Sequence, residues 1–302
     1  MGMLLPTWLR ATLASVVMAV STVMHVLPLL AVAVVKIVIR FSPVRAVCDR
    51  ILIAIAESWI AVNTAMIRTF TRTHFEVDVQ AQLNPYGHYL VLANHQSWVD
   101  IPVLQAVFNR RIPFLRFFLK SQLFWVPLLG LAWWALDFPF MRRYSKETLA
   151  KHPELAGRDI EATRKACEKF RHIPASIMNF AEGTRFTVAK HRKQASPFLQ
   201  LLKPKAGGVA FVMNALGDAL HSILDITIVY PSGHSTLADL FADRIGEVRV
   251  HVRELPIPAE LVSGDYERDP AARERMQLWI NDLWAQKDLR IAEMRRAPLD
   301  RS

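Results

Sequence analysis

The chain has 302 residues, a formal net charge of +10, a pI of about 9.9 and 52% hydrophobic residues. This length allows one large domain with an appendage, or two domains. A basic chain favours nucleic acid, anionic lipid or anionic substrates as partners, and the apolar excess over ordinary soluble domains favours lipid. Its two cysteines, Cys48 and Cys167, argue against a disulfide framework and fit a reducing compartment.

The N-terminal stretch of 25 residues from 11 to 35 contains no Asp, Glu, Lys or Arg. It is long enough to cross a bilayer, although Pro28 also permits a kinked span or a re-entrant helical pair. Arg10 precedes the stretch, and four basic residues follow it closely: Lys36, Arg40, Arg45 and Arg50. This asymmetry places the bulk of the chain in the cytoplasm. We expect residues 1–72 to form a membrane anchor with amphipathic helices, one of them at 49–70.

The chain after residue 73 alternates predicted strands and helices. Residues 75–80 alternate apolar with polar side chains, as in a half-buried strand, whereas 88–93 is typical of a buried strand. A helix is predicted at 101–108. Further strands are expected at 174–181, 223–230 and 248–253, the last as an edge strand, and further helices at 145–172, 206–220 and 270–296. This alternation predicts the α/β class.

A second apolar stretch lies at residues 117–140. Between Lys120 and Asp137 it has 16 uncharged residues, Pro127 and Gly130 among them, which is short for a membrane span. Its tryptophans favour a membrane interface, so we predict a buried or interfacial helix here.

The motif Asn94-His-Gln-Ser-Trp-Val-Asp100 lies between a predicted strand and a predicted helix. Side chains at such a turn reach an open site, and a histidine there can take a proton from a hydroxyl if a carboxylate orients its ring. His95 is therefore a candidate general base and Asp100 its orienting carboxylate. The spacing Ser97-x-x-Asp100 also fits a capping box, which is a purely structural alternative.

A second motif, Phe180-Ala-Glu-Gly-Thr-Arg-Phe-Thr187, follows another predicted strand. Arg185 could hold a phosphate with its guanidinium fork, and the amides of Gly183 and Thr184 could add donors. The alternative is an ordinary turn in which Glu182 pairs with a solvated Arg185.

Other basic residues could also contact an anion. Lys120, Arg142 and Arg143 flank the Trp-rich stretch, a basic loop is expected at 190–193, and Lys203-Pro-Lys-Ala-Gly-Gly208 precedes a predicted helix. Snorkelling at a membrane interface, or a simple loop, is the structural alternative. The sequence has no phosphate-binding Gly-x-x-x-x-Gly-Lys-Ser/Thr loop, no Gly-x-Ser-x-Gly elbow and no His/Cys cluster with zinc spacing.

Four sequence blocks occur in a fixed order between residues 75 and 235. They are Asn-His-x4-Asp, Leu-Lys-Ser-Gln-Leu continuing to Phe140-Met-Arg-Arg143, Phe-Ala-Glu-Gly-Thr-Arg, and a strand ending in Tyr230-Pro231. Together they resemble the glycerolipid acyltransferase family, nearest its lysocardiolipin and lysophosphatidate (1-acylglycerol-3-phosphate) acyltransferases. The resemblance implies a mixed, mostly parallel sheet flanked by helices, in a catalytic domain over residues 73–302 that follows an N-terminal membrane-embedded helical segment.

The resemblance also implies site roles. His95 corresponds to the family's general base, Asp100 to the aspartate that orients it, and Pro231 to a block linked to acyl-donor binding or local structure. The residues implied in acceptor and phosphate binding are Arg143, Glu182, Gly183, Thr184 and Arg185, with Lys120 and Lys205 as weaker candidates. The chain departs from the family at Ala181, where proline is usual, and in the glycine often found before Phe-x-x-Arg, which leaves the choice between Arg142 and Arg143 open.

These implications predict a membrane-bound acyltransferase. It would move a fatty acyl group from acyl-CoA or acyl-carrier protein to the free hydroxyl of 1-acyl-sn-glycerol-3-phosphate and form phosphatidate, without a metal or bound cofactor. The expected partners are the lysophospholipid, the donor and an anionic membrane surface, and the expected location is the bacterial inner membrane with the catalytic domain facing the cytoplasm. Another lysophospholipid as acceptor and a non-catalytic lipid-binding role are alternatives, whereas the uncharged stretch at 11–35 argues against nucleic-acid binding.

Overall fold

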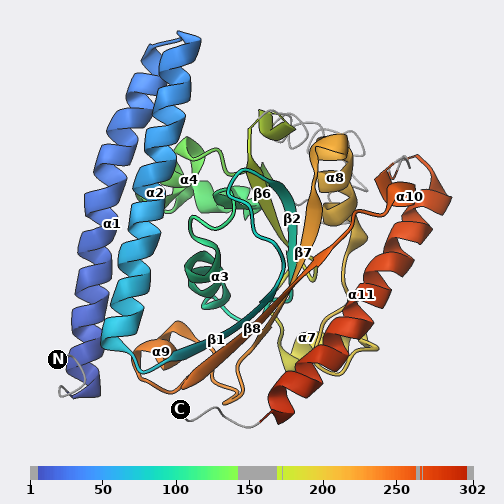
Figure 1. Cartoon of the computed structure of the whole chain (residues 1–302). Coiled ribbons are helices and arrows are strands. Elements are labelled where there is room, and N and C mark those ends of the chain that lie inside the picture. The colour runs from blue at the N-terminus through green and yellow to red at the C-terminus, as the bar shows by residue number, and fades with distance from the viewer. Residues whose placement is uncertain (1–5, 142–168, 172, 263–265, 267, 298–302) are drawn as a thin grey trace.

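The computed structural model describes residues 6–141, 169–171, 173–262, 266 and 268–297. Its N-terminal part is a hairpin of two long helices, α1 (Thr7–Val38) and α2 (Ser42–Phe70), which lie side by side along one flank (Figure 1). Both are long and apolar enough to cross a membrane by length and composition. Pro28 lies inside α1 without ending it. The expected apolar helical segment is present, and α2 begins at Ser42 rather than at residue 49.

Both ends of α1 are tied to the rest of the molecule. Near the start of the helix, Arg10 forms an ion pair with Asp243, and the Arg10 side chain is 5% exposed. Near its end, the Lys36 ammonium lies 3.2 Å from Asp137, which follows α4 (Leu129–Ala135). The uncharged stretch of α1 therefore lies between two contacts to the same globular unit.

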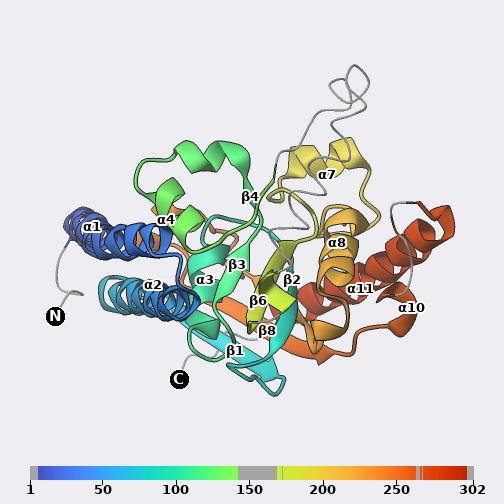
Figure 2. The same ribbon diagram turned by 90° about the horizontal axis from the view of Figure 1, so that it is seen from above.

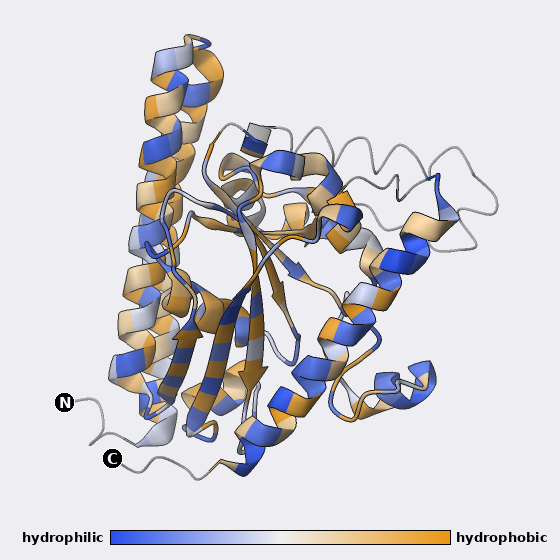
Figure 3. Ribbon diagram, turned by 45° about the vertical axis from the view of Figure 1, so that its right-hand side comes forward, coloured by the Kyte–Doolittle hydropathy of each residue, from blue (hydrophilic) through white to orange (hydrophobic). Residues whose placement is uncertain are grey.

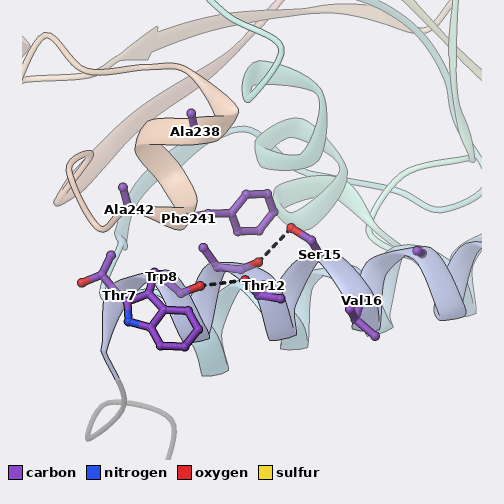
Figure 4. Close-up of a pocket in the computed structure, with 10 residues that line it drawn as sticks. Thr7, Trp8, Thr12, Ser15, Val16, Ala238, Phe241 and Ala242 are labelled. Atoms are coloured by element: carbon purple, nitrogen blue, oxygen red, sulfur yellow. Dashed lines mark hydrogen bonds between the residues drawn. The ribbon is translucent and has the colours of Figure 1, made fainter.

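An apolar groove of about 920 Å³ lies where the first turns of α1 meet α9 (Leu237–Phe241), with the exposed Trp8 at its edge (Figure 4). The hydroxyls along this part of α1 are satisfied within the helix. Thr12 donates to the Trp8 carbonyl at 2.9 Å, and Ser15 donates to the Ala11 carbonyl at 2.8 Å. Because these hydroxyls already have acceptors, the surface is suited to an apolar environment.

The centre of the molecule is a six-stranded sheet with the order β1-β8-β7-β2-β6-β3. Its strands are β1 (His74–Gln80), β2 (His88–Ala93), β3 (Leu115–Phe117), β6 (Ala175–Phe180), β7 (Ser222–Val229) and β8 (Glu247–Leu255). Neighbouring strands are parallel except for β7 with β8. The predicted α/β fold with a mixed, mostly parallel sheet is confirmed.

The prediction of an edge strand at 248–253 is wrong, because β8 pairs with β1 on one side and with β7 on the other. Its alternating pattern reflects two faces of different polarity and not a missing neighbour. The polar face is covered by the C-terminal helix α11 (Pro270–Arg296): Arg249 donates to the carbonyl of Ala297 at 3.0 Å, and Arg253 donates to Gln286 at 3.0 Å. Figure 3 shows this alternation as stripes along the strands.

Helices cover both faces of the sheet (Figure 2). The apolar residues of α3 (Asp100–Phe108) and of the α1–α2 hairpin belong to one buried cluster, and those of α8 (Ala206–Leu216) and α11 belong to another. The helix α8 approaches the sheet closely at Gly208, where a Cβ atom would lie 2.7 Å from the Asn179 amide nitrogen. The two clusters hold the carboxyl ends of the parallel strands in place from both sides.

The predicted helix at 117–140 is confirmed only in part, because just seven residues of this stretch form an α-helix. Beyond the end of β3, this stretch forms β4 (Leu119–Lys120), the 3₁₀ helix Ser121–Trp125, α4 and β5 (Phe140–Met141). The chain turns sharply before α4, with Leu128 at φ +62°, and Gly130 lies where a Cβ would meet the Phe124 carbonyl oxygen at 1.8 Å. Pro127 and Gly130 therefore permit a compact turn where apolar composition alone favours a helix.

Two other expectations concern basic or polar segments. The basic loop at 190–193 is instead the middle of a short helix, α7 (Val188–Gln194), because the Thr187 hydroxyl caps its N-terminus by accepting from the Lys190 amide at 3.2 Å. The helix expected at 145–172 lies almost wholly outside the described residues. Three short helices complete the described elements: the 3₁₀ helices Lys169–Arg171 and Gly217–Ala219, and α10 (Ala259–Val262).

Candidate active site

The candidate site is at the carboxyl ends of β2 and β6. These strands are parallel and in register, with Ala93 opposite Phe180. Parallel strands end at the same edge of a sheet, so the two sequence motifs leave the sheet together. The Phe186 amide donates to the His95 carbonyl at 2.7 Å, which ties the second motif directly to the first.

His95 and Asp100 form a hydrogen-bonded pair at this edge. His95 Nδ1 lies 2.8 Å from Asp100 Oδ2; the imidazole is 14% exposed and the carboxylate is fully buried. Asp100 Oδ2 also accepts from the amides of Gln96, at 2.7 Å, and Ser97, at 2.9 Å. Because a carboxylate accepts at Nδ1, this nitrogen carries the proton and Nε2 is left with a free lone pair.

The capping-box alternative describes part of the same turn. Asp100, in the first turn of α3, reaches back to the Ser97 amide, as the acidic member of a box does. The Ser97 hydroxyl, however, accepts from the Val99 amide at 3.0 Å, so the reciprocal bond to the helix is absent. One carboxylate therefore both closes the turn and orients the histidine.

Two side chains without a predicted role support this pair. Phe180 stacks on the His95 imidazole with a centroid distance of 3.9 Å and an interplanar angle of 14°. The buried Asn94 side chain donates to the Ile228 carbonyl and accepts from the Ile228 amide, both at 2.9 Å. Asn94 thus joins the end of β2 to β7, and Phe180 holds the plane of the imidazole ring.

Glu182 faces the protein interior. Its side chain is fully buried, Oε1 accepts from the His95 amide at 3.1 Å, and Oε2 accepts from the Leu202 amide at 3.1 Å. Burial raises the pKa of this carboxyl to about 8. Both oxygens are engaged with the main chain, so the geometry suits a residue that positions the His95 turn better than one that contacts a substrate.

Arg185 is an exposed member of the second motif. Its guanidinium carbon lies 4.7 Å from the centroid of the Trp98 ring, and Trp98 is 48% exposed. Gly183 makes the preceding turn with φ +69°, and its amide donates to the Phe180 carbonyl at 2.8 Å. A cation–π contact of this kind holds a guanidinium in place and leaves its donors available.

The structure distributes the other predicted residues differently. Thr184 accepts from the Lys190 ammonium at 2.8 Å, which brings a lysine of α7 beside the motif. Lys120 and Lys205 are exposed, and within the described part of the chain no hydrogen bond or ion pair links their side chains to His95 or Arg185. Arg142 and Arg143 lie outside the described residues. Across those residues, no group of three or more His, Cys, Asp or Glu side chains could hold a metal ion.

Sequence reasoning gave no role to Asn94, Trp98, Phe180 or Tyr230. Each of them contacts a partner on another strand or loop. The strand register that brings these partners together is a property of the tertiary structure. A weak signal existed for all four, since Asn94 and Trp98 lie in the first motif, Phe180 begins the second, and Tyr230 ends the strand of the last block.

Comparison with known proteins agrees with the predicted resemblance. Residues 74–231, just over half of the chain, match the Acyltransferase family model. Mouse lysocardiolipin acyltransferase 1 is 24% identical over 253 residues, which is 78% of this chain and 62% of that protein. Human 1-acyl-sn-glycerol-3-phosphate acyltransferase gamma is 23% identical over 222 residues, or 69% of this chain and 54% of that protein.

The chain therefore spans a little over half the length of these curated relatives. Among solved structures, the 1-acyl-sn-glycerophosphate acyltransferase PlsC from Thermotoga maritima has the same fold, with a TM-score of 0.54 over 93% of this chain and 98% of that one, at 18% identity. The family match, the sheet and the paired motifs at its edge together lead to one conclusion: the chain belongs to the acyltransferase family.

Proposed function

We propose that this chain is a membrane-bound 1-acylglycerol-3-phosphate O-acyltransferase. It moves a fatty acyl group from an acyl thioester, acyl-CoA or acyl-carrier protein, to the free hydroxyl of 1-acyl-sn-glycerol-3-phosphate and forms phosphatidate. The observation that carries the proposal is the 2.8 Å contact between His95 Nδ1 and the buried Asp100 carboxylate. The similarity to a human enzyme named for this acceptor supports the substrate class.

The reaction follows from the chemistry of this pair. His95 Nε2 takes the proton of the acceptor hydroxyl as the hydroxyl oxygen attacks the thioester carbonyl carbon. A C–O ester bond forms, the C–S bond breaks, and the leaving thiolate takes the proton back from the imidazolium. The Asp100 carboxylate stabilises the imidazolium between these two transfers. The thioester is a co-substrate, and these steps use no metal or bound cofactor.

Arg185 is the described residue best suited to hold the acceptor phosphate. It is exposed, it is stacked on Trp98, and the adjacent Phe186 amide is bonded to the His95 carbonyl. A phosphate on this guanidinium would lie beside the general base. In this proposal Glu182 acts through the His95 amide. Contacts of the acceptor with Gly183, Thr184, Arg143, Lys120 and Lys205 stay predictions.

The membrane-binding part of the proposal rests on the α1–α2 hairpin and on the charge of the chain. The hairpin exposes many large apolar side chains, including Met24, Leu27 and Val34. With a net charge of +10, the chain is attracted to anionic lipid. We place the protein at the bacterial inner membrane with its catalytic domain facing the cytoplasm, where lysophospholipid and acyl thioester can both reach His95.

Acylation of a different lysophospholipid is the second candidate. It is favoured by the similarity to lysocardiolipin acyltransferase 1 of mouse and chicken, at 24% and 25% identity. The chemistry at His95 would be the same, and the acceptor headgroup would differ.

The test is acylation of lysophosphatidate by purified full-length protein in detergent–lipid micelles, with acyl-CoA or acyl-carrier protein as donor. We expect wild type to form phosphatidate and His95→Ala to lose about 10²-fold to 10⁴-fold in kcat, the usual contribution of a general base. A panel of lysolipids ranks the acceptors. Inactivity of wild type with every lysolipid and both donors would overturn the proposed function and favour a lipid-binding role. Full activity of His95→Ala would overturn the mechanism.

A further inference from the structure

The Tyr230 side chain reaches the Asp100 carboxylate from a neighbouring strand. Its hydroxyl donates to Asp100 Oδ1 at 2.7 Å, and the tyrosine is 1% exposed. The other carboxylate oxygen, Oδ2, accepts from His95 and from the amides of Gln96 and Ser97. Tyr230 therefore binds the carboxylate on the side opposite the histidine.

Tyr230 is held firmly in this position. It directly follows β7, whose end is fixed to β2 through the paired Asn94–Ile228 hydrogen bonds. Its own carbonyl accepts from the Gly233 amide at 3.0 Å, which closes the turn after Pro231. Burial, and then the nearby Asp100 charge, raise the pKa of the Tyr230 hydroxyl well above its usual value, so it stays protonated and remains a donor.

This hydrogen bond affects the two charge states of the histidine differently. When His95 is neutral, the Asp100 charge is uncompensated and depends most on its donors. When His95 is protonated, the imidazolium neutralises much of that charge. A donor to Asp100 therefore favours the neutral histidine relative to the imidazolium and lowers the pH at which the base becomes available.

We infer that Tyr230 is a positioning residue for catalysis: it holds Asp100 in the orientation that presents His95 as a base, and it tunes the protonation of the pair. The inference rests on the proposed function. Among the described residues, the other titratable group bonded to this turn is Glu182, which accepts from the His95 amide and is unchanged in the test below.

The test compares Tyr230→Phe with wild type in full-length protein. We expect kcat to fall about tenfold or more, as for the loss of a hydrogen bond to a charged group, while KM for lysophosphatidate changes less than about twofold. The acid limb of the kcat/KM profile should move to higher pH by about half a unit or more. A smaller amount of folded protein alone would lower the apparent kcat equally at every pH and would not shift the acid limb of the profile.

The matched control is Tyr89→Phe. Tyr89 is also a buried tyrosine, 3% exposed, and its hydroxyl accepts from the Asn84 amide at 3.0 Å, at the opposite end of β2. This variant should lose comparable stability and keep the wild-type kcat and pH profile. Equal kinetic effects in both variants, or wild-type kinetics in Tyr230→Phe, would overturn the inference.

A second readout does not need turnover. The imidazole of His95 can be titrated by NMR in histidine-labelled protein, with His95→Ala identifying its signal. We expect Tyr230→Phe to raise the pH midpoint of this signal and Tyr89→Phe to leave it unchanged. If wild type lacks acyltransferase activity but the midpoint moves, the proposed function fails and the positioning role stands. An unmoved midpoint overturns the role.

Discussion

Asp100 combines a structural and a chemical task in one carboxylate. It accepts from two backbone amides of the turn, from the histidine and from a tyrosine of another strand, and it is fully buried. In the proposed mechanism, these donors hold the carboxylate in the position that orients the histidine. At Glu182, burial outweighs the two amide donors and raises the pKa of the carboxyl to about 8.

This raised pKa predicts a pH dependence of stability. Between the usual glutamate pKa of about 4.5 and about 8, the folded state keeps a proton on Glu182 that the unfolded state releases. The resulting stabilisation is complete below about pH 4.5 and is lost as the pH rises through about 8. The slope contributed by this group is at most about 1.4 kcal/mol per pH unit.

Glu182→Gln should remove this dependence. The variant also turns an amide donor toward the Leu202 N–H, so it should be less stable than wild type by about 1–3 kcal/mol at pH 5. The difference in the free energy of unfolding should then shrink toward pH 8, as measured by urea unfolding in micelles. Glu274→Gln, on the exposed face of α11, is the control. A difference that stays constant with pH contradicts the assigned pKa.

At the scale of elements, α11 is attached to the sheet through a buried charge. Lys287 reaches β7, where its ammonium lies 2.6 Å from Asp225 and donates to the Ile226 carbonyl at 2.5 Å. Both side chains are at most 2% exposed, and Arg253 of β8 contacts the other oxygen of Asp225 at 2.7 Å. Burial lowers the pKa of Lys287, and Asp225 partly restores it. The pair specifies how the polar face of the sheet packs on α11.

Lys287→Met should lower the free energy of unfolding by about 3–5 kcal/mol, because it leaves a buried carboxylate with one partner fewer. The double variant Lys287→Met/Asp225→Asn should cost less than the sum of the two single variants. Arg275→Met, at an exposed position of the same helix, should change stability by less than about 0.5 kcal/mol. Strict additivity in urea unfolding would show that the two residues do not interact.

At the scale of the whole molecule, the two contacts of α1 restrict how the hairpin enters a membrane. Arg10 pairs with Asp243 and Lys36 pairs with Asp137, so both ends of the uncharged stretch contact the globular part of the chain. If α1 crossed the bilayer, one of these pairs would have to break, because Asp243 and Asp137 belong to a domain on one side. We therefore propose a hairpin that lies along one leaflet and does not cross the bilayer.

Single cysteines introduced without Cys48 and Cys167 test this topology. The exposed positions Trp8→Cys, Phe41→Cys and Tyr86→Cys mark the start of α1, the hairpin loop and the globular part of the chain. With a membrane-impermeant maleimide, we expect all three cysteines to stay unlabelled in intact bacterial cells. After lysis, Trp8→Cys and Tyr86→Cys should react, whereas Phe41→Cys either reacts or remains protected by lipid. Labelling of Phe41→Cys in intact cells would show that the helices cross the membrane.

Much of the fold could be predicted from local sequence pattern. The apolar run before His95 and the polar turn after it indicated a strand and a helix, and both formed, because their side-chain periodicity matches one type of structure. The pattern failed at 117–140, where Pro127 and Gly130 admit a compact turn, and at 248–253, where alternation was mistaken for an edge. Burial by α11, which is distant in sequence, decided the second case.

The same distinction between local sequence pattern and tertiary structure applies to the candidate site. His95 and Asp100 are five residues apart, so one turn of chain brings them together, and residue type and spacing made them a candidate pair that the ordered motifs of the family then favoured. Tyr230 reaches Asp100 across 130 positions, and Glu182 reaches the His95 amide across 87. Those contacts depend on the parallel register of β2, β6 and β7, which brings three strand ends to one edge. The sequence by itself determined the candidate reacting groups, and the tertiary structure decided which side chains orient them, because strand register depends on interactions along the whole sheet that no local pattern contains.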